Sequence, residues 1–223
     1  MKTWLQRLFD VRRDEVLPVC LAVLFFFCVL VALMILRPAR EALGLRGGID
    51  AVRWLFMGTA LAALLVNPLF GWLVSRFPRR VFLPVIYGFF IATLLVFYAM
   101  FDSGIAGRGL AFILWITVFN LFAVAVFWSF MADVFTNVEA RKYYGYIGAA
   151  GTVGAILGPV LTRTFVERIG IANLMLVSAG FLVVCVVCQL RLRLWAVARE
   201  QERRATSGET PMGGEVLAGL KLI

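Results

Sequence analysis

Six long stretches of the chain carry no charged side chain, and this pattern restricts the fold more than any other feature. A helix rises about 1.5 Å per residue, so roughly 20 apolar residues cross a hydrocarbon layer about 30 Å thick. Within lipid each segment must satisfy its own backbone hydrogen bonds, which favours helices. The sequence therefore predicts an all-α membrane protein with six transmembrane helices, at 16–36, 54–74, 81–101, 109–132, 145–162 and 169–190.

The composition argues against a soluble enzyme. Hydrophobic residues make up 62% of the 223 positions, against about 45–50% in soluble domains. Histidine is absent, which removes the commonest general base and metal ligand. Cys185 and Cys188 form a CxxC pair inside a predicted span, and we interpret them as packing residues. No nucleophile lies near a base in the sequence, so we predict no catalytic centre, no metal and no cofactor.

The net charge of +9 has two interpretations, nucleic-acid binding or a membrane protein with basic loops. The arginines gather between the apolar runs, which favours a lipid bilayer as partner and no nucleic acid. With the N-terminus inside, 15 of the 22 basic residues lie on the inner side. The positive-inside rule then predicts that both termini are cytoplasmic.

The two ends of the chain are predicted to lie outside the bundle at 16–190. Residues 1–15 place apolar and charged side chains on opposite helical faces, which predicts an amphipathic cytoplasmic lead-in. Residues 191–223 are charged and then rich in Thr, Ser, Gly and Pro, which predicts a cytoplasmic linker that begins a second half.

The six runs repeat internally. A shift of about 91 residues overlays the first three runs on the last three and places Asn67-Pro68 on Gly158-Pro159. Three spans per copy give the copies opposite topology. The pattern resembles the inverted three-helix repeats of major facilitator transporters, and it implies half of such a fold.

The loop at 71–80 also resembles that superfamily. Its cytoplasmic signature reads G-x-L-x-D-R-x-G-R-R, and Ser75 and Pro78 depart from it. An ordinary basic loop is the alternative interpretation. The matching residues proposed as the loop motif are Gly71, Arg76, Arg79 and Arg80, with Leu73 between them.

The fifth run resembles the glycine–proline signature in the fifth helix of many facilitator-type exchangers. Gly145, Gly154, Gly158 and Pro159 carry the likeness. A stripe of glycines lets two helices approach closely, and a proline allows bending. Close packing and a helix that rocks during transport are both compatible with this pattern.

The first run ends with Arg37, Arg40 and Glu41 on one helical face. Two guanidinium groups suit an anion, and snorkelling at the interface is the alternative. This run, together with residues 127–135, resembles the ATP/ADP exchange carriers and their wider bacterial relatives. The resemblance implies that Arg37, Arg40 and Glu41 line the outer pathway and that Asp133 lies at the inner end.

Asn67, Asn120 and Trp128 are further candidates, for either substrate or helix–helix contacts. We expect the N-terminal half of a secondary transporter in a bacterial inner membrane. It would move a small anionic solute by alternating access, and the resemblance to the exchange carriers implies that this solute could be nucleotide-like. A second six-helix half or another copy would complete the pathway. The alternative is a non-transporting membrane scaffold built on the same bundle.

Overall fold

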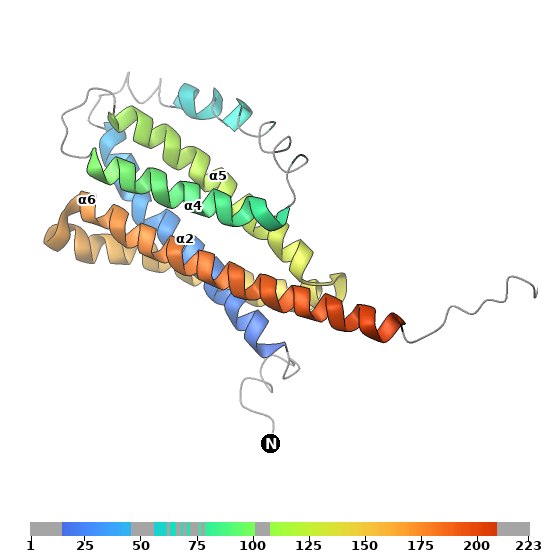
Figure 1. Ribbon diagram of the computed structural model, residues 1–223. Coiled ribbons are helices and arrows are strands. Elements are labelled where there is room, and N and C mark those ends of the chain that lie inside the picture. Colours follow the sequence, from blue (N-terminus) through green and yellow to red (C-terminus); the bar gives the residue numbers. More distant parts are fainter. Residues whose placement is uncertain are drawn as a thin grey trace, which may run out of the picture.

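The computed structural model describes residues 15–45, 56–61, 63–65, 79–100 and 108–208, and the single positions 68, 71 and 76. Throughout these parts the backbone is almost entirely helical and forms no strand. The long helices, in chain order, are α2 (Val16–Leu45), α4 (Arg79–Ala99), α5 (Arg108–Val134) and α6 (Asn137–Gly208) (Figure 1).

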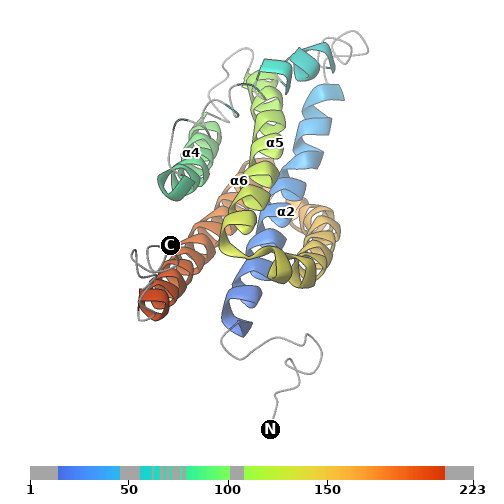
Figure 2. The same cartoon turned by 90° about the vertical axis from the view of Figure 1, so that its right-hand side faces the viewer.

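Helix α6 consists of two arms that meet at Gly170. This glycine has φ 77° and ψ 167°, which is not helical, and the chain reverses there (Figure 1). We call residues 137–169 the first arm and residues 171–208 the second arm. Helix α2 runs between the two arms (Figure 2) and contacts both of them.

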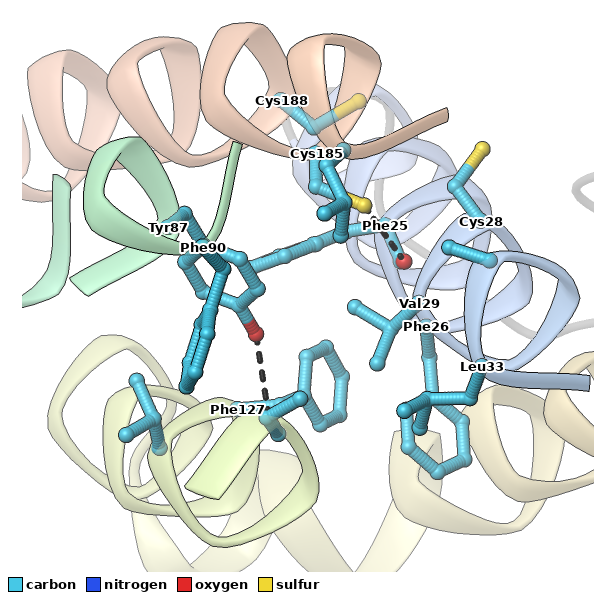
Figure 3. Packing of buried hydrophobic residues seen from close by; sticks show 14 of the residues in the cluster. Phe25, Phe26, Cys28, Val29, Leu33, Tyr87, Phe90, Phe127, Cys185 and Cys188 are labelled. Atoms are coloured by element: carbon cyan, nitrogen blue, oxygen red, sulfur yellow. Dashed lines mark hydrogen bonds between the residues drawn. The ribbon is translucent and has the colours of Figure 1, made fainter. Parts of the chain in front are cut away.

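The core lies where α2, α4, α5 and the second arm meet. Phe25 packs edge-on against Tyr87 and Phe127, and all three side chains are fully buried. The Tyr87 hydroxyl donates a 3.0 Å hydrogen bond to the Ala123 carbonyl (Figure 3). Because that carbonyl belongs to α5, the bond fixes α4 to α5.

Three cysteine thiols belong to this core, and they are free. Cys28, Cys185 and Cys188 are each at most 2% exposed (Figure 3). The thiol of Cys185 contacts the Phe25 carbonyl oxygen at 3.7 Å. The CxxC pair thus occupies packing positions between helices, as the apolar context of the sequence indicates.

Large apolar side chains also remain exposed on the outer faces of these helices. Phe89 on α4, Ile156 on the first arm, and Val187 and Leu194 on the second arm are about half exposed or more. Exposed apolar area of this extent suits contact with lipid. The chain is a multi-pass membrane protein, as its apolar helices require.

Among the described residues, three helices are long and apolar enough to cross a membrane. They are Val16–Pro38, Ala111–Val134 and Asn137–Glu202, the last of which contains the turn at Gly170. Phe56–Leu65 and Pro84–Ala99 are shorter apolar helices. The predicted run 54–74 is only partly described, so the count of six spans stays a prediction.

The helix ends differ from the boundaries predicted from charge. The predicted breaks at 133–144 and 163–168 are largely helical, because α6 begins at Asn137 and its first arm runs to 169. Residues 191–208, predicted as linker, continue the second arm as helix. Helices extend past the hydrocarbon layer, so a charge marks the membrane surface and not a helix end. The lead-in 1–14 and residues 209–223 lie outside the described residues.

Candidate functional site

The glycines of the first arm let α6 touch α2. A Cβ atom on Gly154 would lie 2.6 Å from the Phe27 carbonyl oxygen. A Cβ on Gly151 would overlap the Phe26 ring, and one on Gly158 would overlap Met34. At Gly154 and Gly158 the nearest atoms include the backbone of α2, so a side chain there would push the two helices apart, whereas at Gly151 the nearest atoms belong to side chains.

The other members of the glycine–proline pattern lie differently. Among the described residues, a Cβ built on Gly145 meets no atom of another helix within 4 Å, so this glycine makes no close crossing there. Pro159 lies inside the first arm, and the non-helical backbone of α6 occurs at Gly170 instead. Gly154 and Gly158 therefore lie in the close contact with α2, while a rocking role for the glycine–proline motif stays a prediction.

Small polar side chains hold α2 from both arms. On the first arm the Thr162 hydroxyl donates to the Ile35 carbonyl at 3.0 Å. On the second arm the Ser178 hydroxyl donates to the Ala32 carbonyl at 3.0 Å. Both side chains are buried, so these bonds satisfy polar groups that would otherwise be costly in an apolar setting.

The cationic end of α2 carries an exposed ion pair. Arg37 Nε lies 3.3 Å from Glu41 Oε1, one helical turn apart, with about 60% of each side chain exposed. Arg40 is half-buried on the same helix, which continues through Pro38. A guanidinium has five N–H donors, so an Arg37 that contacts one carboxylate can still bind an anion.

Asp133 lies at the opposite end of the α2–α5 pair. The two helices run antiparallel (Figure 2), and Phe26 of α2 stacks on Phe127 of α5 at 4.4 Å between ring centroids. Glu41 is near the end of α2 and Asp133 is near the end of α5, and both are exposed. The structure thus separates the two acids along the helix axes.

An aromatic group lies beside Asp133. Trp128 contacts Phe26 and Tyr144, each at 5.1 Å between ring centroids, and it is half-buried. It therefore joins α5 to α2 and to the first arm. Asn120, in the middle of α5, is exposed and far from this group along the helix. Trp128 makes a helix–helix contact, and a substrate role for Trp128 or Asn120 stays a prediction.

The loop motif is described only in part. Gly71 and Arg76 are exposed. Arg79 and Arg80 begin α4. The side chains of these last two residues lie outside the described part of the chain, as does Asn67. The loop motif and Asn67 therefore stay predictions.

Residues from three separate segments of the chain form a polar cluster that the sequence did not indicate. Arg199, from the second arm, forms an ion pair with Glu139 and lies 3.9 Å from Glu15. The Tyr143 hydroxyl donates to Glu15 Oε2 at 2.5 Å. We call Glu15, Glu139, Tyr143 and Arg199 the Arg199 cluster. It joins the start of α2, the start of α6 and the far end of the second arm.

Local structure positions Glu139 within the Arg199 cluster. The Thr136 backbone amide donates to Glu139 Oε2 at 2.9 Å, so Thr136 and Glu139 form half of a capping box at the start of α6. The spacing of Thr136 and Glu139 was a usable signal for this helix start. Nothing in the sequence, however, relates Glu139 to Arg199 or to Glu15.

Glu139 precedes the fifth predicted span, and its pKa is strongly perturbed. Partial burial raises the pKa, but hydrogen bonds from Arg199 and from the Thr136 amide outweigh burial and lower it to about 2. The carboxylate is therefore ionised at neutral pH. Burial, followed by the bond to Glu15, raises the pKa of Tyr143, so its hydroxyl stays protonated and donates.

The comparison with known families agrees with this architecture. The model of the Major Facilitator Superfamily matches residues 19–222, which is nearly the whole chain. No curated protein and no solved structure matches it. The family match indicates a secondary transporter, not an enzyme, and the apolar helices indicate that it crosses the membrane more than once. The chain belongs to the Major Facilitator Superfamily.

Proposed function

We propose that the chain is the N-terminal half of a secondary transporter that moves a small anionic solute by alternating access. The single observation that supports this most is the placement of Arg37 and Glu41 at one end of the α2–α5 pair and of Asp133 at the other. Alternating access needs a gate at each membrane face, and separated charged groups suit that need.

In this proposal Arg37 and Arg40 receive the anion. Two guanidinium groups near the end of a span attract carboxylate or phosphate and bind it by paired N–H donors. A nucleotide-like solute is one version of the proposal, supported only by the likeness of residues 36–41 to the exchange carriers. The match to the superfamily carries no substrate, so the experiment must compare several anions.

The pathway itself is proposed to form between this bundle of six helices, built as inverted repeats, and a second six-helix unit. The exposed apolar faces of α4 and of both arms offer surface for such a partner as well as for lipid. The unit would sit in a bacterial inner membrane with both termini in the cytoplasm, as the distribution of basic residues favours.

Counterflow in proteoliposomes tests the proposal. Vesicles that contain the protein would be loaded with ATP, ADP, inorganic phosphate or a dicarboxylate, and exchange with the same labelled solute outside would be measured. We expect exchange of at least one anion. Arg37→Gln and Arg40→Gln should raise the half-saturating concentration about tenfold, which corresponds to the loss of one charge-assisted contact. Arg163→Gln, an exposed position on the first arm, is the matched control.

Glu41→Gln and Asp133→Asn test the two gates. Each should slow exchange without abolishing anion binding, which a thermal-shift titration measures. If neither variant changes the exchange rate, the gate assignment is wrong. If no anion exchanges and none shifts the melting temperature, a non-transporting membrane scaffold becomes the better interpretation of this bundle.

A further inference from the structure

The second arm of α6 continues past the last predicted span without a break. Three side chains on one stripe of this continuation, at i, i+3 and i+7, face the bundle. Leu192 is fully buried, Trp195 is half-buried, and the Arg199 side chain is only a quarter exposed. A solvated connector would not bury such a stripe. The stretch 191–199 therefore packs as part of the bundle.

Trp195 and Arg199 contact two other parts of the chain, which are the segment around the α5–α6 turn and the start of α2. Trp195 lies 6.4 Å, centroid to centroid, from Phe135 at the turn between α5 and α6. The Arg199 guanidinium lies 4.9 Å from the centre of the Trp195 ring. The same guanidinium then reaches Glu139 and approaches Glu15. Arg199 is thus the meeting point of three separate segments.

The two carboxylates of the Arg199 cluster need partners, because they are close to one another and nearly buried. Glu15 and Glu139 expose only 10% and 11% of their side chains, and one guanidinium lies beside both. Two carboxylates in such a setting repel each other and lose hydration, so each depends on its partners. Tyr143 gives Glu15 its closest hydrogen bond, and Arg199 gives Glu139 its ion pair.

We propose that Arg199 controls the conformation of the end of the second arm, and we call its contacts within the Arg199 cluster the clasp. It fastens the stretch 191–208 to the start of α2 and to the α5–α6 turn, so that this stretch moves with the bundle as one rigid arm. The position of Gly208 relative to the bundle is then set by the Arg199 cluster. Composition predicts a cytoplasmic linker for this stretch, and a linker without these contacts would leave that position free.

Hydrogen–deuterium exchange of the whole chain in lipid nanodiscs tests the clasp. In the wild type, amides at 192–205 should exchange slowly, since they open only with the Arg199 cluster. Arg199→Ala should speed exchange there and at the start of α2 about tenfold, which corresponds to about 1.4 kcal/mol of local opening free energy. Amides at 174–188, in the core, should keep their wild-type rates and so report an intact bundle.

Matched variants separate the clasp from a general loss of charge. Arg163→Ala and Glu167→Gln remove exposed charges from the first arm and should leave exchange unchanged at 192–205. Glu139→Gln should speed exchange in that stretch. The double variant with Arg199→Ala should be no faster than Arg199→Ala alone, because both changes remove one interaction.

Milder variants keep the test decisive if Arg199→Ala does not fold. Tyr143→Phe retains the ring and removes only the hydroxyl that contacts Glu15, so exchange at 16–22 should rise severalfold. Arg199→Lys retains the charge and should give an intermediate rate at 192–205. The proposal is overturned if both variants exchange as the wild type does, or if 192–205 already exchanges at the rate of an unstructured peptide in the wild type.

Discussion

At Gly154 the backbone of the first arm comes as close to the backbone of α2 as a glycine allows. The nearest atom to a built Cβ is the Phe27 carbonyl oxygen, which belongs to rigid helix backbone and cannot rotate away. At Gly151 the nearest atoms belong to the Phe26 ring, which can reorient. The same added methyl group therefore has a different cost at each glycine.

Gly154→Ala is expected to destabilise the protein by about 1–3 kcal/mol, because the helices must separate to admit the Cβ atom. Gly145→Ala and Gly180→Ala meet no atom within 4 Å and should be neutral or slightly stabilising, since alanine favours a helix. Thermal unfolding in detergent, followed by circular dichroism at 222 nm, checks this. Equal melting temperatures for Gly154→Ala and Gly145→Ala would contradict the close crossing.

Thr162 and Thr164 offer a matched pair for the hydrogen bond to α2. Thr162 donates to the Ile35 carbonyl of α2 and is buried, whereas Thr164 is exposed and donates only within its own helix, to Val160. Thr162→Val should cost about 0.6 kcal/mol, the average for such bonds in membrane bundles. Thr164→Val should cost less. The measurement is the same unfolding experiment, and a larger loss at Thr164 would refute the assignment.

The residues of the candidate site were only partly predictable from sequence. Arg37 and Glu41 lie one helical turn apart, so helical spacing alone predicts their contact, and the structure contains it. The glycine stripe predicts a close helix crossing, but not that Gly154 is in contact while Gly145 is not. The Arg199 cluster joins residues that are distant in sequence, and no local pattern relates them.

At the scale of elements, the turn at Gly170 determines how α6 packs against the rest of the bundle. Its backbone, at φ 77° and ψ 167°, occupies a region open almost only to glycine. Beyond its chain neighbours, no described residue places a heavy atom within 4 Å of a Cβ built there, so a substitution is penalised by the backbone conformation. The reversal brings both arms of α6 onto α2, which one continuous helix could not do.

Gly170→Ala should therefore destabilise the protein by about 1–3 kcal/mol, although it introduces no clash. Gly180→Ala, within the second arm, has equally open surroundings and a helical backbone, and it should not destabilise. Chemical unfolding of the two variants separates backbone strain from packing. If both variants unfold like the wild type, the turn does not need a left-handed residue.

The elements themselves were predictable, and their ends were not. Uncharged runs indicate where lipid surrounds a helix. Three of the six predicted runs, 16–36, 109–132 and 145–162, lie within single described helices, and the run 169–190 contains the turn at Gly170 before it continues in the second arm. Helix α4 covers most of a fifth, at 81–101. The segments 163–168 and 191–208 are charged and still helical, because water satisfies charged side chains without breaking backbone hydrogen bonds.

At the scale of the whole molecule, the two arms of α6 define a hairpin whose closed end is Gly170. Arg141 lies near the open end and Arg168 near the closed end, and both side chains are exposed. If each arm crosses the bilayer, these arginines lie on opposite membrane faces. The distribution of basic residues predicts that Arg141 lies on the cytoplasmic face and Arg168 on the outer face.

Arg141→Cys and Arg168→Cys, each in a Cys20→Ser background, make this orientation measurable, since the other native cysteines are buried. A membrane-impermeant maleimide added to intact cells should label the Arg168 variant and not the Arg141 variant. Inverted membrane vesicles should give the reverse result, because they expose the cytoplasmic face. Labelling of both variants from one side would mean that the hairpin does not cross the bilayer. Labelling in the opposite sense would invert the topology and place Arg37 and Glu41 on the cytoplasmic face.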